Sequence, residues 1–221
     1  MGDDPLADRV AAVAALDEPT RRRLYEHVVR QPEPVGRDEV AAEFGLSRGT
    51  VAFHLDKLVE EDLLEVTFRR RTGRTGPGAG RPSKLYQRSG RHLAVSLPER
   101  QYELAGELLA AAMEEADAQA ESPRAVLGRR AFQYGRDLGQ RYGDAPLAHV
   151  LEDQGFEPRT ENGETVLVNC PFHTLARTHT ELVCGMNLHL LTGLLTGLNA
   201  DAVEARLVPT PNRCCVRLTP T

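Results

Sequence analysis

The chain has 221 residues, a formal net charge of −5 and a hydrophobic fraction of 41%. This length predicts one or two domains, and the composition excludes a disordered or fibrous protein. No apolar run reaches the roughly 18 residues of a membrane span, and the N-terminus lacks the pattern of a secretory signal, so we expect a cytoplasmic protein without a membrane partner. In that compartment its four cysteines are expected to be metal ligands, redox thiols or core residues rather than structural disulfides.

The N-terminal region is predicted to be helical at first and to end in a hairpin. Residues 6–31 are helical throughout, with Asp17 as the N-cap of a second helix. A short helix over 37–45 precedes a longer one over 47–63. The two strands of the hairpin are expected at 63–70 and 83–89.

The junction between the two later helices has the pattern of a helix-turn-helix motif. Ala41 is small enough for two helices to cross closely, and Gly45 can adopt the positive φ of a tight turn. Leu46 is expected to pack beneath that turn, and Ser47 to cap the next helix. Residues 47–58 are therefore predicted to be a recognition helix, which enters the major groove of double-stranded DNA.

The outward side of the recognition helix and the basic hairpin form the predicted DNA-binding surface. Phe53 is an unusual apolar residue on a polar face, so it contacts either a thymine methyl group or a neighbouring loop. The hairpin region between Val66 and His92 contains no Asp or Glu, as expected for a wing that lies along phosphates. The predicted contacts are Ser47, Arg48, Gly49, Thr50, Phe53, His54, Lys57, Arg69, Arg70, Arg71, Arg74, Arg81 and Lys84.

The rest of the chain is predicted to mix helices and strands. Asn162-Gly163 is a strong signal for a hairpin turn between two extended runs. Helices are expected over residues 97–121, 122–142, 144–156, 172–183 and 188–198, and the last strands over 202–208 and 213–218. The glycines Gly193 and Gly197 leave space along an apolar helix, which could line a ligand pocket. No nucleophile–base motif or phosphate loop is visible, so we do not expect an enzyme.

The cysteines are candidate ligands of a soft metal or a cluster, because thiolate favours zinc, copper(I) and iron–sulfur clusters. Cys170 opens the stretch "NCPFHTLARTHTELVCGMN", and Cys184 lies near its end. Strand alternation is expected to turn Cys214 toward the core and Cys215 away from it. The spacing alone is also compatible with buried cysteines that only pack. His173, His179, Cys215 and a ligand from an outside molecule remain open as the fourth ligand, with His173 as the main candidate.

Two stretches carry a family resemblance. "EVAAEFGLSRGTVAFHLDKLVEEDLLEV" followed by "GRPSKLYQRS" resembles the winged-helix regulators of the ArsR and SufR groups, which bind DNA as homodimers. One departure is Asp62, which stands where such sequences often have Gly. "NCPFHTLARTHTELVCGMNLHLLTGLLTGL" and "RCCVRL" resemble the C-terminal domain of SufR-type repressors, which is related to vinyl-reductase-like domains.

The resemblance implies an iron–sulfur cluster bound by Cys170, Cys184 and Cys214, with zinc as the alternative metal. Arg206 stands where some relatives have a further cysteine, which leaves the fourth ligand undefined. The implied function is a homodimeric repressor that reads a near-palindromic operator and senses redox or cluster status. A small-molecule-sensing regulator with a structural zinc or no metal is the alternative.

The predicted fold class is α+β with three segments. Residues 1–92 are expected to form a winged helix-turn-helix domain, residues 93–122 a linking dimerisation helix, and residues 123–221 an α+β sensor domain.

Overall fold

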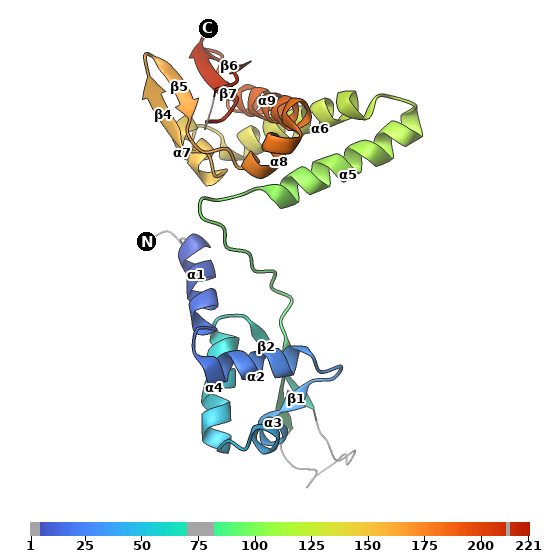
Figure 1. The fold of residues 1–221 in the computed structure, drawn as a ribbon, viewed down its shortest axis with the longest axis vertical. Helices are drawn as coiled ribbons and strands as arrows, with labels where there is room; N and C mark the ends of the chain where they lie inside the picture. Colours follow the sequence, from blue (N-terminus) through green and yellow to red (C-terminus); the bar gives the residue numbers. More distant parts are fainter. Residues whose placement is uncertain (1–4, 70–81, 211–212) are drawn as a thin grey trace. The chain divides into compact units, whose positions relative to one another are not determined.

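A computed structural model describes residues 5–69, 82–210 and 213–221, which fall into two compact units, 1–95 and 96–221. Both units combine helices with a small antiparallel sheet, so the predicted α+β class is confirmed (Figure 1). None of the helices in these ranges has the length and apolar character that a membrane span requires.

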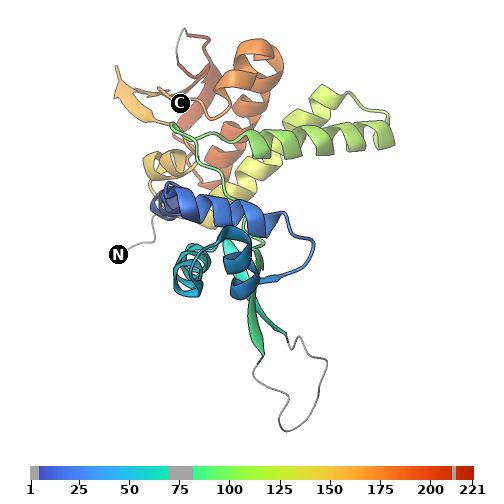
Figure 2. The ribbon, with the colours of Figure 1, turned by 60° about the horizontal axis from the view of Figure 1, so that its bottom comes forward.

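The first unit is a helical cluster with a three-stranded sheet of order β1–β3–β2. Its elements are α1 (Pro5–Ala15), α2 (Pro19–Val29), β1 (Val35–Gly36), α3 (Arg37–Phe44), α4 (Arg48–Glu60), β2 (Leu64–Arg69) and β3 (Ser83–Arg88). The strands β2 and β3 pair antiparallel from Leu64 opposite Arg88 to Arg69 opposite Ser83, and they project from the helices as the predicted hairpin (Figure 2).

Two details of this unit differ from the prediction. The N-cap of α2 is Glu18 rather than Asp17: its carboxylate accepts hydrogen bonds from the backbone N–H groups of Thr20 and Arg21, at 3.0 and 2.6 Å. The side chain of Glu is long enough to reach both donors, whereas Asp17 precedes the cap. The short strand β1 was not predicted, because two residues are too few to show alternation; Val35 pairs with Tyr86.

The second unit packs five helices against a four-stranded antiparallel sheet of order β4–β5–β7–β6. Its elements are α5 (Tyr102–Gln119), α6 (Pro123–Tyr142), α7 (Leu147–Asp153), β4 (Pro158–Glu161), β5 (Glu164–Leu167), α8 (His173–Thr178), α9 (Thr180–Gly197), β6 (Val203–Leu207) and β7 (Val216–Pro220). Asn162 and Gly163, with φ of 52° and 83°, form the predicted hairpin turn.

The helices around Cys184 differ from the prediction. The run expected to be one helix breaks at His179, whose φ of −128° and ψ of 50° are not helical. The second half then continues without interruption to Gly197, so Cys184 lies inside α9 rather than at a helix end. Periodicity could not show this, because the apolar pattern continues across both junctions.

Helices α6 and α9 lie side by side along the centre of this unit (Figures 1 and 2). Their backbones touch at glycines: a Cβ atom at Gly193 would lie 2.0 Å from the carbonyl oxygen of Phe132, and one at Gly135 would lie 2.0 Å from that of Leu190. Gly197 meets the carbonyl oxygen of Arg136 in the same way, at 2.2 Å. The expected ligand pocket beside Gly193 and Gly197 is therefore wrong, because α6 fills that space.

Helix α5, which the sequence assigned to a separate linking segment, packs in the core of the second unit. Its side chains Ala105, Leu108, Ala112 and Ala116 are buried in one apolar cluster with residues of α6 and α9. Met113, which lies beside this buried row, is 52% exposed. One face of α5 is therefore buried in the core of its own chain.

We expect Gly193→Ala to destabilise the second unit by about 1–3 kcal/mol, because the added methyl group overlaps the backbone of α6. The measurement is the free energy of unfolding from denaturant titration. Gly185→Ala is the matched control on the same helix: nothing lies within 4 Å of its Cβ position, and replacing a helical Gly by Ala stabilises by up to about 1 kcal/mol. Equal stability of the two variants would contradict the close approach.

Candidate DNA-binding face and cysteine site

The turn between α3 and α4 has the predicted helix-turn-helix geometry. Gly45 adopts φ of 63° and ψ of 28°, the left-handed conformation that ends α3. The backbone N–H of Leu46 donates to the carbonyl oxygen of Ala41 at 3.1 Å. The hydroxyl of Ser47 accepts from the backbone N–H of Thr50 at 3.1 Å and so caps α4. The departure at Asp62 is also accommodated, since its φ is 59°.

Helix α4 divides cleanly into a buried and an exposed side. Val51, Leu55 and Leu58 are fully buried in the core of the first unit. Gly49 and Thr50 are exposed near the N-terminus of the helix, and Phe53 is 66% exposed. No described residue buries the Phe53 ring, so the expectation that it packs under a neighbouring loop is not met within that part of the chain.

Three charged or titratable residues of α4 have intrachain partners. Arg48 donates from two guanidinium nitrogens to the carboxylate of Asp38 on α3. Lys57 pairs with Glu61 at 2.7 Å on the C-terminal side of the helix. His54, predicted to meet DNA, has a side chain only 12% exposed, and its Nδ1 lies 3.4 Å from the Glu18 carboxylate. The prediction that His54 is a DNA contact therefore disagrees with its burial beside Glu18, the N-cap of α2.

A polar contact joins the recognition helix to the hairpin. The Asp56 carboxylate accepts hydrogen bonds from Lys84 Nζ at 2.5 Å and from the Tyr86 hydroxyl at 2.8 Å, both on β3. Burial raises the pKa of Asp56, but these two hydrogen bonds outweigh it and lower the pKa below its ordinary value. Burial and the bond to Asp56 raise the pKa of Tyr86. The predicted DNA contact Lys84 is thus also a structural anchor.

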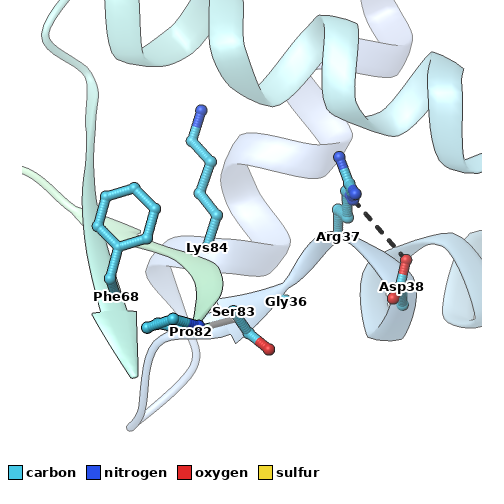
Figure 3. Close-up of a pocket in the computed structure, with 7 residues that line it drawn as sticks. All are labelled: Gly36, Arg37, Asp38, Phe68, Pro82, Ser83 and Lys84. Carbon is cyan, nitrogen blue, oxygen red and sulfur yellow. Dashed lines mark ion pairs between the residues drawn. The ribbon is translucent and has the colours of Figure 1, made fainter. Parts of the chain in front are cut away.

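A cleft lies between the start of α3 and the hairpin (Figure 3). Arg37 and Asp38 line one side of it, and Lys84 and Phe68 line the other. Phe68 is 63% exposed and was not among the predicted contacts, although an aromatic residue next to a basic run was a visible signal. The cleft is lined by Gly36, Arg37, Asp38, Phe68, Pro82, Ser83 and Lys84.

Most of the predicted wing arginines lie outside the described residues: Arg70, Arg71, Arg74 and Arg81. Arg69 ends β2 and pairs with Glu33 at 3.2 Å. Its side chain is 59% exposed, so this pair leaves it accessible to a phosphate.

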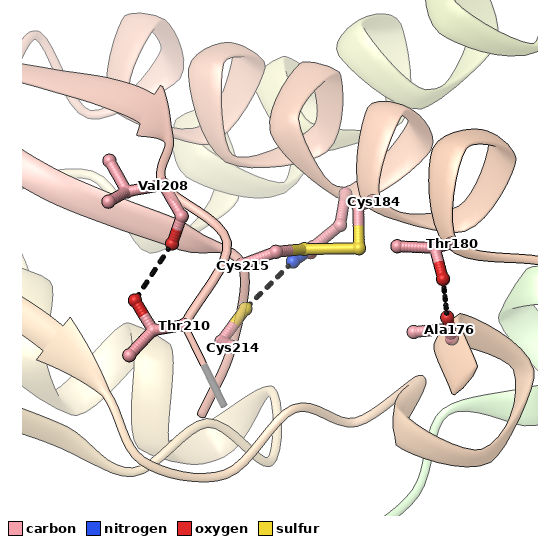
Figure 4. Close-up of a disulfide and its surroundings, with 8 residues drawn as sticks. Ala176, Thr180, Cys184, Val208, Thr210, Cys214 and Cys215 are labelled. Atoms are coloured by element: carbon pink, nitrogen blue, oxygen red, sulfur yellow. Dashed lines mark hydrogen bonds between the residues drawn. A yellow bond between two sulfur atoms is a disulfide. The ribbon is translucent and has the colours of Figure 1, made fainter. Parts of the chain in front are cut away.

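All four cysteines line one pocket in the second unit. Figure 4 shows three of them, Cys184, Cys214 and Cys215. Each is buried, with exposed fractions of 6% for Cys170, 5% for Cys184, 3% for Cys214 and 9% for Cys215. Cys184 and Cys215 form a disulfide with a Cα–Cα distance of 6.3 Å, and Cys170 and Cys214 are free thiols. The structure therefore brings together the three cysteines that the sequence predicted as ligands, and adds the fourth.

The expectation that Cys215 points away from the core is wrong. It rested on strand alternation, but β7 begins only at Val216. Before that strand the chain is irregular: Cys214 N–H donates to the Leu167 carbonyl oxygen at 3.0 Å, while the Cys215 carbonyl oxygen accepts from Val208 N–H at 2.6 Å. Two successive cysteines can therefore both turn inward.

The two free thiols are hydrogen-bonded to each other. The Cys214 thiol donates to Cys170, which lowers the pKa of Cys170 and raises that of Cys214; the backbone N–H of Phe172 and the nearby Arg100 also favour the Cys170 thiolate. Asn187 is 1% exposed and donates from Nδ2 to Cys214 Sγ at 3.3 Å. Sequence reasoning missed Asn187, because the predicted helices ended at residue 183 and began again at 188; the structure places Cys184 and Asn187 on one continuous helix, α9.

The two predicted histidine candidates differ in position. His173 lines the cysteine pocket with an exposed side chain, whereas His179 is exposed and does not line it. Arg206 lies on the exposed part of β6 and pairs with Glu204 at 2.7 Å. Within the described part of the chain, no group of three or more His, Cys, Asp or Glu side chains is arranged to hold a metal ion. Two of the four cysteines are joined in the disulfide.

The loop that carries Cys170 is tied to the segment before α5. The Arg100 guanidinium donates to Asn169 Oδ1 at 2.6 Å and to the Cys170 carbonyl oxygen at 2.8 Å. The buried Asn169 amide donates in turn to the Gly155 carbonyl oxygen at 2.6 Å, and Gln101 N–H donates to the Pro171 carbonyl oxygen at 3.2 Å. Residues 99–102 belong to the segment that follows the first unit in the chain. No pattern in the sequence indicated that this segment contacts the Cys170 loop.

We expect Asp56→Asn to lower the free energy of unfolding by about 1 kcal/mol or less at neutral pH, since solvent screens the half-exposed Asp56–Lys84 pair. A depressed folded-state pKa contributes stability above the unfolded pKa, near 3.9, and this stability is lost as pH falls through the folded value. The difference between variant and wild type should therefore shrink below about pH 4. Denaturant titration over a pH series measures it.

Glu60→Gln is the matched control, because Glu60 is an exposed carboxylate on the same helix that pairs with Lys57 at 3.2 Å. It should change the free energy of unfolding by less than about 0.5 kcal/mol. A deficit in Asp56→Asn that persisted unchanged at low pH would rule out the ionised contact as its cause.

A comparison with known families agrees with this geometry. A family model described as a helix-turn-helix domain matches residues 16–67, which contain α2, α3, α4 and the start of β2. No curated protein matches the chain. The match covers less than half of the chain and does not reach the cysteine site. The first unit is therefore the winged helix-turn-helix of a DNA-binding transcription regulator.

Proposed function

We propose that this protein is a homodimeric transcription repressor whose second unit binds an iron–sulfur cluster and reports redox or cluster status to the DNA-binding unit. The observation that carries the proposal is the convergence of four buried cysteines on one pocket. Cysteine thiolates that converge in this way are the donors that a soft metal or an iron–sulfur cluster favours.

The donor set of the pocket fits a cluster. Iron–sulfur clusters are held by cysteine thiolates, and hydrogen bonds to the sulfurs tune them. Cys170, Cys184 and Cys214 supply sulfur from a loop, a helix and the segment before β7, and Asn187 donates to one of these sulfurs. When bound, the cluster would supply a redox-sensitive crosslink between these three segments. Zinc would fit the same thiolates as the alternative metal.

The chain's own contacts supply a route for the signal. Arg100 holds the Cys170 loop against the segment that leads to the DNA-binding unit. When the sulfur atoms lose their common ligand, the loop that bears Cys170 is freed to move, and Arg100 and Gln101 move with it. A coupling of about 1–3 kcal/mol, or about 5–150-fold in operator affinity, would be enough for regulation.

The DNA-binding unit is expected to read a near-palindromic operator as one half of a symmetric dimer. Exposed apolar side chains on α1 and α5 support such a dimer: Val10 is 44% exposed, Val13 48% and Met113 52%. The exposed residues Thr50 and Phe53 of α4 would meet base edges, and the wing arginines would lie along phosphates.

We expect the triple variant Arg70→Ala, Arg71→Ala, Arg74→Ala to bind operator and random DNA more weakly by a similar factor. Phosphate contacts carry no sequence information, so each lost contact should reduce the salt slope of log K by about 1. Fluorescence anisotropy over a salt series measures both. A control triple variant of exposed arginines in the second unit, Arg124→Ala, Arg141→Ala, Arg159→Ala, should keep the wild-type slope.

Phe53→Ala, measured in the same experiment, should change sequence preference rather than overall affinity for DNA. Loss of a thymine methyl contact should reduce the preference for operator over random DNA, by about 1 kcal/mol, while the salt slope stays unchanged. A uniform loss of affinity in this variant would instead assign Phe53 to the fold.

Anaerobically purified protein is expected to contain iron and acid-labile sulfide and to absorb visible light, and Cys170→Ser should lose all three signals. Elemental analysis and an absorption spectrum measure this. Colourless, iron-free protein that binds its operator tightly would contradict cluster sensing. Arg100→Ala tests cluster binding and signalling separately. The variant should still bind the cluster, but its operator affinity should be the same with and without the cluster.

A further inference from the structure

We infer that Cys215 is the fourth sulfur ligand of the site, and that the Cys184–Cys215 disulfide is the oxidised, cluster-free form of the same site. This inference rests on the proposed cluster and names both its missing ligand and its inactive state. The sequence favoured His173 for that position and left Cys215 as an alternative.

Position and burial favour Cys215 over the histidines. Cys215 is 9% exposed and its sulfur is bonded to that of Cys184, so the two side chains already share the pocket. His179 does not line the pocket, and His173 lines it with an exposed side chain. A soft metal centre surrounded by three buried sulfurs is completed most readily by a fourth buried sulfur.

A buried hydrogen-bond donor lies beside the cysteine sulfurs. The Asn187 amide is 1% exposed, and among the described residues its Oδ1 accepts no hydrogen bond. Its Nδ2 donates to Cys214 Sγ at 3.3 Å, and a buried donor at this position would also stabilise that sulfur as a thiolate ligand. Cys170 and Cys214 meanwhile hydrogen-bond to each other, which satisfies two thiols that have no common ligand. The disulfide and this thiol pair together are therefore a self-contained state of four cysteines.

The two states interconvert by a balanced redox step. Reduction breaks the Sγ–Sγ bond between Cys184 and Cys215; two electrons and two protons from a dithiol reductant give two thiols, and the reductant becomes a disulfide. Ligation then requires the thiols to lose their protons. In the oxidised state only Cys170 and Cys214 can act as ligands, which is too few for a cluster. Oxidation thus blocks reloading until a dithiol acts.

The test uses the full chain in its cluster-free form under anaerobic conditions. Ferrous iron and sulfide are added with or without prior dithiothreitol, and iron uptake and the visible spectrum are recorded. We expect uptake only after reduction by the dithiol. Cys215→Ser should lose uptake, while His173→Ala should retain it. Uptake without the dithiol, or a Cys215→Ser variant with the wild-type spectrum and iron content, overturns the inference.

A second measurement needs no variant. Alkylation followed by peptide mass spectrometry of wild-type protein should find Cys215 protected in the loaded form and reactive after reduction, and should find a Cys184–Cys215 disulfide after oxidation. If Cys215 reacts in loaded protein, or if oxidation forms a different disulfide, the inference is wrong, but the proposed cluster binding still stands. Failure of reduced wild type to take up any cluster instead removes the proposed function, and the inference with it.

Discussion

The backbone contact between α6 and α9 is the constraint on which the second unit depends. Four glycines, Gly135, Gly139, Gly193 and Gly197, let the two helices approach until each lies against the other's carbonyl groups. Because this contact fixes the axis of α9 near its C-terminal end, it also fixes the direction in which its N-terminal half points. That half carries Cys184 and Asn187 on one face, so a packing feature without polar chemistry orients the candidate metal site.

The cysteine site is assembled from segments that differ in rigidity. Cys184 lies on a long buried helix, whereas Cys170 and the pair Cys214 and Cys215 lie on irregular segments at the ends of β5 and β7. Irregular backbone can turn successive side chains the same way, which a strand forbids. It can also move when its contacts change. A rigid helix combined with adaptable segments would suit the proposed site, which alternates between a loaded and an oxidised state.

In the DNA-binding unit, ion pairs and hydrogen bonds hold separate elements in place. Its recognition helix and wing have to present one continuous surface, although they are separate elements. The Asp56 carboxylate joins them through Lys84 and the Tyr86 hydroxyl, while Arg48 joins the start of the helix to Asp38 on α3. Charged side chains that appear available to DNA in the sequence therefore also hold the reading surface together.

The sequence by itself determined the elements whose signals are local. Gly45, Ser47 and the turn at Asn162 depend on backbone conformation and capping within a few residues, so helix-turn-helix and hairpin were predicted correctly. The same holds for the α+β class. Tertiary structure alone decided the rest: His54 is largely buried beside Glu18, α6 fills the space beside Gly193, and an irregular segment turns Cys215 toward Cys184. Each of these depends on a contact between segments far apart in the chain, which no local periodicity encodes.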